Sequence, residues 1–170
     1  MKPIIEKDKF LKNFKGIYSK KAVKKKIIIK GLNLLDAFLD EGGHYIPGKS
    51  TLIITNKEDS IQDLKFMLGI INSSFCFFYM KNKYPASSYI GGINFTPEMF
   101  NNFPLPTVTN ALKKGIISIA DKILSLTQTD DYLENPAKQA RVKEYEHQID
   151  QMVYKLYGLT EEEIKIVEGE

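Results

Sequence analysis

One long apolar segment constrains the fold of this chain more than any other feature. Across residues 60–80, apolar side chains recur at helical spacing, and the second half is apolar on nearly every side. A helix with this pattern is buried by neighbours on more than one face. Its apolar stretch is shorter than the roughly 20 residues that cross a bilayer. We therefore predict one central core helix at 60–80 rather than a membrane helix.

The residues that precede this helix predict a small, mostly antiparallel sheet. Short runs rich in β-branched residues, bounded by Gly, Pro and Lys, predict strands at 24–30, 32–39, 44–46 and 51–55. Lysines at both ends of the first run predict a position near the sheet edge. The expected fold class is α+β, with the sheet packed on the buried core helix and a helical hairpin at the C-terminal end.

Residues 81–94 are predicted to form a loop. The segment has no helical period and is rich in Ser, Gly, Lys and Tyr. A loop of this length within a compact domain is usually functional or disordered. Thr96 and Pro97 then favour a short helix that ends at the proline-rich turn 103–106.

Two long amphipathic helices are expected after this turn. Their apolar stripes lie within 112–126 and 142–156, and the polar linker between them lets the helices fold back as a hairpin. A capping box that begins at Thr160 predicts a short last helix. We expect two units, an α/β part at 1–106 and a helical part at 107–170.

Positive charge is concentrated at the N-terminal end of the chain. Residues 1–30 contain eleven lysines and two acidic residues, so they carry +9, whereas residues 31–170 carry −6. A basic segment of this kind favours binding to a polyanion, because each neutralised phosphate releases condensed counterions. The alternative is a lysine-rich surface that only keeps the protein soluble.

Residues 43–50 satisfy the phosphate-loop pattern G-x-x-x-x-G-K-[ST]. A true phosphate loop follows a strand and opens a helix, whereas residues 51–55 predict a strand. We therefore interpret 43–50 as a hairpin turn. The alternative, a nucleotide-dependent enzyme, would require Lys49 to bind nucleotide.

The other candidate catalytic groups have structural explanations. Glu163 and Lys165 offer the E-x-K element of a nuclease, but the upstream Pro-Asp partner is missing and the glutamate suits a helix cap. His44 and His147 lack neighbours at metal-ligand spacing. Cys76 lies in an apolar helix, which is typical of an inert core thiol. We predict no catalytic residue, no metal site and no cofactor in this chain.

Surface chemistry remains as the functional candidate. The lysines predicted to hold DNA phosphates lie in the basic segment and at the start of the loop: Lys20, Lys21, Lys24, Lys25, Lys26, Lys30, Lys81 and Lys83. The loop side chains predicted to stack, or to bond to the DNA backbone or base edges, are Tyr84, Ser87, Ser88, Tyr89 and Asn94. The alternative is an ordinary polar loop.

Three segments resemble a known family. Residues 64–73 resemble the leucine-leucine-glycine-isoleucine-leucine-asparagine-serine helix of the TaqI-like C-terminal specificity domain of adenine-N6 DNA methyltransferases and type II restriction-modification enzymes. Residues 103–106 are similar to its proline-containing turn, and 153–164 to its terminal tyrosine-glycine-leucine-threonine helix. The order and spacing cover roughly residues 25–170. The turn and long helices are also similar to the recognition domains of type I restriction specificity subunits.

This resemblance implies a part that recognises double-stranded DNA, while a separate methyltransferase domain or subunit binds S-adenosylmethionine and acts on a flipped adenine. The chain has no Asn-Pro-Pro-Tyr motif and no Gly-rich cofactor loop. The partners it implies are double-stranded DNA and a methyltransferase domain or subunit, which a nuclease domain can accompany. Neither a membrane nor a nucleotide is expected as a partner.

A second hypothesis comes from a different functional class. The two amphipathic helices could dock a partner subunit, in which case the chain is an assembly module of a restriction-modification complex and the lysines only keep it soluble. Under either hypothesis we expect a cytoplasmic protein, because the single cysteine cannot form an internal disulfide and no signal-peptide pattern begins the sequence.

Overall fold

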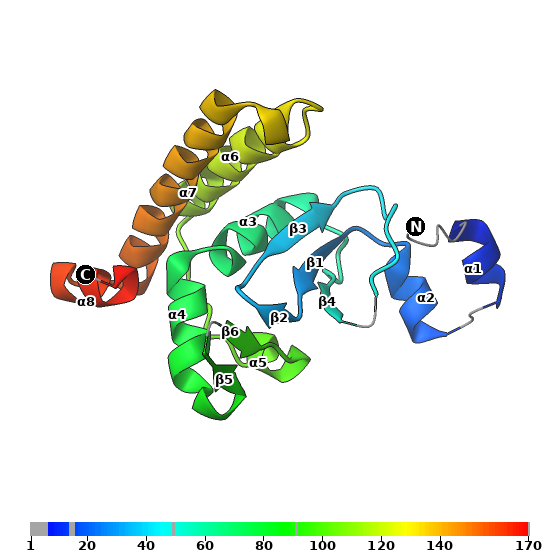
Figure 1. The fold of residues 1–170 in the computed structure, drawn as a ribbon, viewed down its shortest axis with the longest axis horizontal. Coiled ribbons are helices and arrows are strands. Elements are labelled where there is room, and N and C mark those ends of the chain that lie inside the picture. The colour runs from blue at the N-terminus through cyan, green and yellow to red at the C-terminus, as the bar shows by residue number, and fades with distance from the viewer. Residues whose placement is uncertain (1–6, 14–15, 49, 91, 170) are drawn as a thin grey trace.

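The chain has an α+β fold, as predicted (Figure 1). A computed structural model describes residues 7–13, 16–48, 50–90 and 92–169. Helices and short strands alternate in the first part, and helices alone form the last part. In chain order the elements are α1 Lys7–Asn13, α2 Ile17–Ala22, β1 Lys26–Lys30, β2 Leu32–Asn33, β3 Ala37–Asp40, β4 Thr51–Ile54, α3 Ile61–Ile71, α4 Ser74–Lys83, η1 Pro85–Ser87, β5 Ser88–Tyr89, β6 Gly92–Asn94, α5 Pro97–Asn101, α6 Asn110–Thr127, η2 Tyr132–Glu134, α7 Pro136–Tyr157 and α8 Glu161–Glu168.

The larger sheet is antiparallel and has the strand order β3-β1-β4. Ile27 and Ile29 of β1 are fully buried, and they belong to one apolar cluster with Leu64 and Leu68 of α3. The predicted edge position of this strand is wrong, because β1 pairs with a neighbour on each side. Its three isoleucines are all buried, so the apolar run outweighs the flanking lysines in placing the strand.

A smaller sheet contains the strands β2-β6-β5, also antiparallel. The predicted strand at 32–39 is divided between the two sheets, because Asn33 has a φ of 74° and interrupts the extended backbone. The predicted strand at 44–46 does not form. Its amides at His44 and Tyr45 donate to the Asp40 carboxylate instead of to a neighbouring strand.

The predicted core helix is divided into two helices, α3 and α4, that run in different directions (Figure 1). Asn72 ends α3 and exchanges two hydrogen bonds of 2.9 Å with the backbone of Ala37. Ser73 begins α4 by accepting a hydrogen bond from the amide of Cys76. The helix breaks here because both polar side chains satisfy backbone groups, one of them across the fold.

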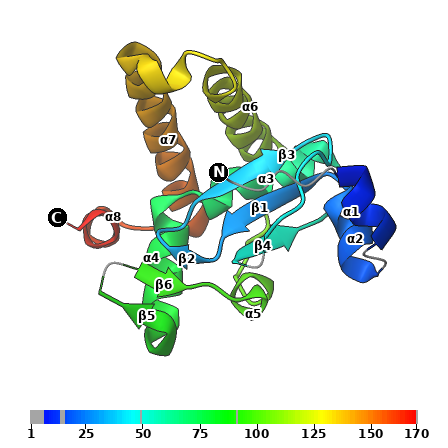
Figure 2. The ribbon, with the colours of Figure 1, turned by 45° about the vertical axis from the view of Figure 1, so that its right-hand side comes forward.

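Helices α6 and α7 form the predicted hairpin, which rises from the body of the molecule (Figure 2). The apolar stripes face inward: Ile116 and Ala120 of α6, and Ile149 and Val153 of α7, are buried. Ile116 and Ile149 share a core cluster with Phe66 of α3, so the hairpin packs on the α/β part. Among the described residues, no helix is long and apolar enough to cross a membrane.

The predicted starts of α5 and α8 are confirmed. Thr96 accepts a hydrogen bond from the amide of Met99 at the start of α5, and Thr109, which was not predicted as a cap, accepts one from the amide of Leu112 at the start of α6. Gly158 ends α7 in a left-handed conformation with a φ of 69°. Thr160 and Glu163 form the capping box of α8.

Candidate nucleic-acid interface

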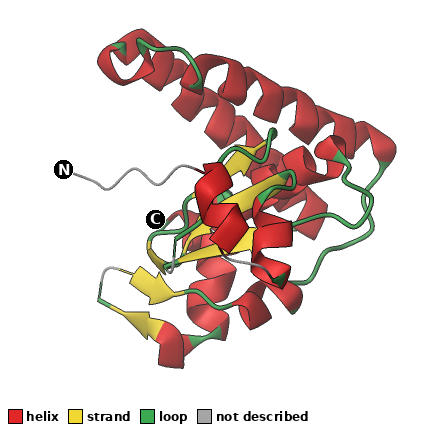
Figure 3. Ribbon diagram, turned by 90° about the vertical axis from the view of Figure 1, so that its right-hand side faces the viewer, coloured by secondary structure: helices red, strands yellow, loops and turns green. Residues whose placement is uncertain are grey.

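The side chains predicted to contact DNA lie in two groups at opposite ends of β1. One group, here the α2 lysines, consists of Lys20, Lys21, Lys24 and Lys25, which lie in or just after α2. The other group surrounds the β5–β6 hairpin, which extends from one edge of the molecule (Figure 3). Within this second group the hairpin site is defined by the exposed residues Lys30, Lys81, Lys83, Tyr89 and Asn94.

The α2 lysines form a basic surface. Lys20, Lys21 and Lys24 are exposed. The Lys25 ammonium lies 3.9 Å from the Asp59 carboxylate, with both side chains about half exposed. An ion pair this open to water is weak, so Lys25 remains available to a phosphate.

Lys26 must be removed from the predicted phosphate contacts. Its side chain is 0% exposed and forms an ion pair with Asp40. The same ammonium donates to the backbone oxygens of Ala22 at 2.6 Å and Lys24 at 3.3 Å. All three of its donors are therefore used inside the protein.

Asp40 completes this buried cluster. Its carboxylate accepts hydrogen bonds from Lys26 and from the amides of His44 and Tyr45 at 2.8 and 3.0 Å. Burial pushes the pKa of Asp40 up, but the hydrogen bonds from Lys26, Tyr45 and His44 outweigh it and hold the pKa below its ordinary value. The cluster joins the end of α2 to β1, β3 and the following loop, and so positions the α2 lysines.

The segment predicted as a loop, 81–94, is largely ordered. The end of α4, a short 3-10 turn and the strands β5 and β6 occupy most of it. Ser88 pairs with Ile93, and Tyr89 pairs with Gly92. Strands of two or three residues are too short to produce a recognisable period in the sequence, which is why the hairpin was not predicted.

Three of the predicted loop residues serve the fold. The Ser88 hydroxyl donates to the backbone oxygens of Lys81 at 3.0 Å and Tyr84 at 3.2 Å, which fastens the hairpin to α4. Tyr84 is half-buried against the main core cluster. Ser87 is also half-buried, and its amide donates to the oxygen of Tyr84. These side chains therefore face the protein more than the surroundings.

Tyr89 and Asn94 lie on the exposed face of the small sheet. The register pairs Leu32 with Asn94 and Tyr89 with Gly92, which places these residues on the face opposite the buried Ile93. The Tyr89 hydroxyl donates to the side-chain oxygen of Asn33, while the Tyr89 residue stays 42% exposed. The Asn94 amide remains open to solvent.

The stretch of sequence that contains the hairpin carries no negatively charged residue. No Asp or Glu occurs between Asp63 and Glu98. In the part of the chain that the structure describes, Lys81 and Lys83 form no ion pair, and Lys81 lies 6.0 Å from the ring centre of Phe77.

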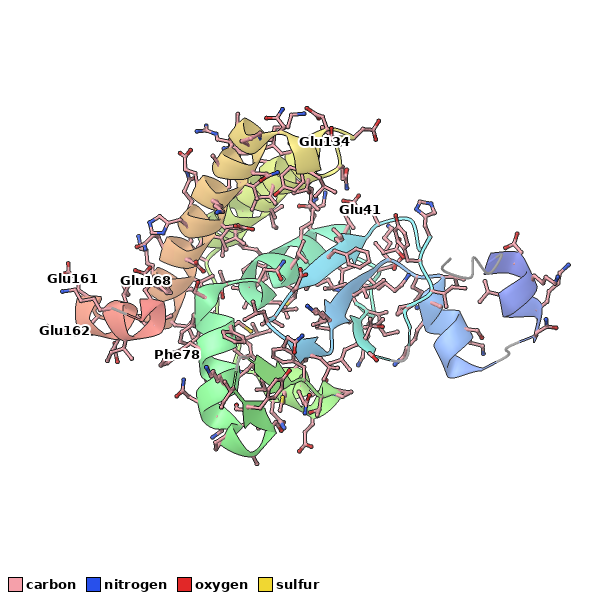
Figure 4. All side chains as sticks on the ribbon, in the orientation of Figure 1. Glu41, Phe78, Glu134, Glu161, Glu162 and Glu168 are labelled. Carbon is pink, nitrogen blue, oxygen red and sulfur yellow. The ribbon has the colours of Figure 1, made fainter. Side chains whose placement is uncertain are left out.

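The acidic side chains labelled in Figure 4 lie along the helical hairpin, on α8 and near β3, while β5 and β6 lie at the lower edge of that view. The labelled acidic residues are Glu41, Glu134, Glu161, Glu162 and Glu168. Lys81 lines one hollow together with Asp150 and Glu168. The hairpin site therefore combines exposed lysines that form no ion pair in the described part of the chain with two side chains that can contact bases.

The structure does not favour a phosphate loop at 43–50. A short strand, β4, follows this segment, whereas a phosphate loop leads directly into a helix. Lys49 lies outside the described residues.

Two of the remaining candidate groups have a structural role, because Glu163 belongs to the capping box of α8 and Cys76 is fully buried. Burial raises the pKa of the Cys76 thiol to about 12. Within the described ranges, no group of His, Cys, Asp and Glu side chains could hold a metal ion.

Sequence reasoning missed two exposed apolar side chains beside the site. Leu32 lies on the same sheet face as Asn94, and Ile90 lies at the turn of the hairpin, fully exposed. The signal for Ile90 was an isoleucine directly before a Gly-Gly pair, which is typical of a hairpin turn. No protein-family model matches this chain.

Proposed function

We propose that this chain recognises double-stranded DNA as the specificity part of a restriction-modification adenine-N6 methyltransferase. Catalysis belongs to a separate domain or subunit that binds S-adenosylmethionine. The observation that carries the proposal is the hairpin site, in which Tyr89 and Asn94 lie on an exposed sheet face and the exposed lysines Lys30, Lys81 and Lys83 end the adjoining elements β1 and α4.

The chemistry of this face suits base edges. A two-stranded β-ribbon fits the major groove of B-DNA, and an Asn amide can donate and accept at the N6 and N7 atoms of an adenine. Asn94 presents such an amide from the exposed face of β6. The Tyr89 ring offers an apolar surface for a base or sugar beside it. Its hydroxyl bond to Asn33 fixes the ring, so little side-chain entropy is lost on binding.

The lysines of the hairpin site and the α2 lysines can bind DNA phosphates. Lys81 and Lys83 lie in the last turn of α4, and Lys30 ends β1 immediately before the small sheet. The α2 lysines lie beyond the other end of β1, a strand that itself spans about 13 Å at about 3.3 Å per residue. The two basic groups could therefore hold phosphates at two places along one duplex.

The structure of the helical hairpin does not support the alternative in which α6 and α7 dock a partner subunit. Docking through the apolar stripes would need them to be exposed, whereas Ile116, Ile149 and Val153 are buried in the core of the chain itself. The structure offers no specific observation in favour of that alternative among the described residues.

The test compares DNA binding of two charge-matched triple variants across salt concentrations. The variant K30Q/K81Q/K83Q removes the lysines of the hairpin site, and the control K114Q/K143Q/K155Q removes exposed lysines of α6 and α7. We expect the first variant to reduce the slope of log K against log salt by about 0.9 for each phosphate that is no longer neutralised. The control should keep the wild-type slope. Equal slopes for both variants would refute the hairpin site as the phosphate-binding surface.

A further inference from the structure

Ile90 is a large apolar side chain that the fold leaves fully exposed. The pairing of Tyr89 with Gly92 places Ile90 first in the connection between β5 and β6. Two-residue hairpin connections usually carry Asn, Asp or Gly, because these residues adopt the positive φ that such turns require and are compatible with exposure to solvent. Ile90 buries no surface in the protein, so its presence has no explanation in stability.

The hairpin below Ile90 is fixed to the protein by several contacts. Ser88 donates to two backbone oxygens at the end of α4, and the Tyr89 hydroxyl donates to Asn33. Ile93 is fully buried in the main core cluster. A Cβ atom on Gly92 would lie 2.5 Å from the Cα of Asn33, which shows how closely β6 and β2 approach. The tip therefore extends from a rigid base.

The charge around the tip suits a nucleic acid. Lys81 and Lys83 both lie in the last turn of α4, just before the hairpin, and the chain carries no acidic residue from 64 to 97. A base stack is an apolar surface between two rows of phosphates. An apolar tip that follows two exposed lysines closely in the chain can meet both kinds of surface.

Building on the proposed DNA-binding function, we propose that Ile90 is a wedge that inserts between adjacent base pairs and partly unstacks them. Isoleucine is among the apolar side chains that proteins insert at base steps, kinking the duplex. Unstacking has a free-energy cost, so a wedge must be held firmly, which the anchored hairpin provides. Ile90 thus makes recognition sensitive to how easily a base step deforms.

The experiment uses the full chain and mixed-sequence duplexes that carry one 2-aminopurine at each position in turn. The emission of 2-aminopurine rises when the base loses its stacking neighbours, and fluorescence anisotropy of an end label reports binding separately. The test variant is Ile90→Ser. The matched control is Leu133→Ser, at a side chain 82% exposed in the turn between α6 and α7. Neither substitution removes a buried contact, so both variants should melt at the wild-type temperature.

We expect wild type to raise the emission at a limited set of steps, and Leu133→Ser to do the same. Ile90→Ser should abolish the rise while weakening affinity by less than about tenfold, because the phosphate contacts remain. DNA binding by wild type without any rise in emission, or a rise in emission that persists in Ile90→Ser, would refute the wedge but not the proposed DNA binding. No anisotropy change with any duplex would refute DNA binding itself and the wedge with it.

Discussion

Lys26 and Asp40 form an ion pair that is closed to solvent at the junction of α2 with the larger sheet. The lysine also bonds to the end of α2, and the aspartate to the loop after β3. The most basic segment of the chain is therefore attached to the sheet through one of its own lysines. The charge run has two roles: Lys26 supports the fold, and its neighbours remain on the surface.

Asp40→Asn should destabilise the protein strongly. Removing one partner of a buried ion pair leaves the other charge without compensation, which costs about 3–5 kcal/mol of unfolding free energy. Urea denaturation at neutral pH measures the loss. The control is Asp59→Asn at the exposed pair with Lys25, where the loss should stay below about 1 kcal/mol. Equal losses for the two variants would contradict the buried role of Asp40.

The same variant should change how stability depends on pH. The pKa of Asp40 is lower in the folded protein than in the unfolded chain, where it is about 3.9. The stability that its charge contributes is therefore present above pH about 4 and is lost as the pH falls through the folded pKa. The stability difference between wild type and Asp40→Asn should narrow below pH about 4. A constant difference down to pH about 2 would argue against this linkage.

Cys76 should resist thiol reagents in the native protein. The side chain is fully buried, and burial raises the pKa of its thiol to about 12, so the reactive thiolate is scarce near neutral pH. Labelling with a chromogenic disulfide should be slow in buffer and complete in urea. Because Cys76 is the only cysteine, the whole signal belongs to it. Rapid labelling of the folded protein would show that α4 is not packed as described.

Gly92→Ala should loosen the small sheet. The added Cβ would lie 2.5 Å from the Cα of Asn33 and 2.9 Å from its carbonyl carbon, so the backbones of β2 and β6 must separate. Overpacking of this kind costs about 1–3 kcal/mol. Thermal unfolding measures the loss, and Gly48→Ala, with no atom within 4 Å of the new Cβ, is the control. A melting temperature like that of the control would mean that β2 and β6 approach less closely.

The sequence predicted the fold class and the helical hairpin because long periodic segments carry a strong signal. The stripes of α6 and α7, and the cap at Thr160, depend on neighbours close in sequence. The break between α3 and α4 could not be predicted in this way. It depends on Asn72 finding the backbone of Ala37, which is far away in the sequence.

The candidate site was predicted only in part, for the same reason. Tyr89 and Asn94 were selected for their chemistry, and the structure places them on one exposed face. In the sequence, Lys26 cannot be distinguished from its neighbouring lysines, because its partner Asp40 lies beside it only when β1 pairs with β3. Ile90 was missed because only basic, polar and aromatic side chains of the predicted loop were considered as DNA contacts, and the sequence alone does not show which apolar residue is exposed.

The central claim is that this chain reads a DNA sequence through the hairpin site. The most direct measurement is selection of the full chain on a randomised duplex library at two salt concentrations, with Asn94→Ala run in parallel. We predict a defined motif for wild type that persists at the higher salt, and relaxed preference at one position for Asn94→Ala, because the alanine side chain cannot bond to a base edge. Enrichment of no motif by the folded wild-type protein, at either salt concentration, would contradict the claim.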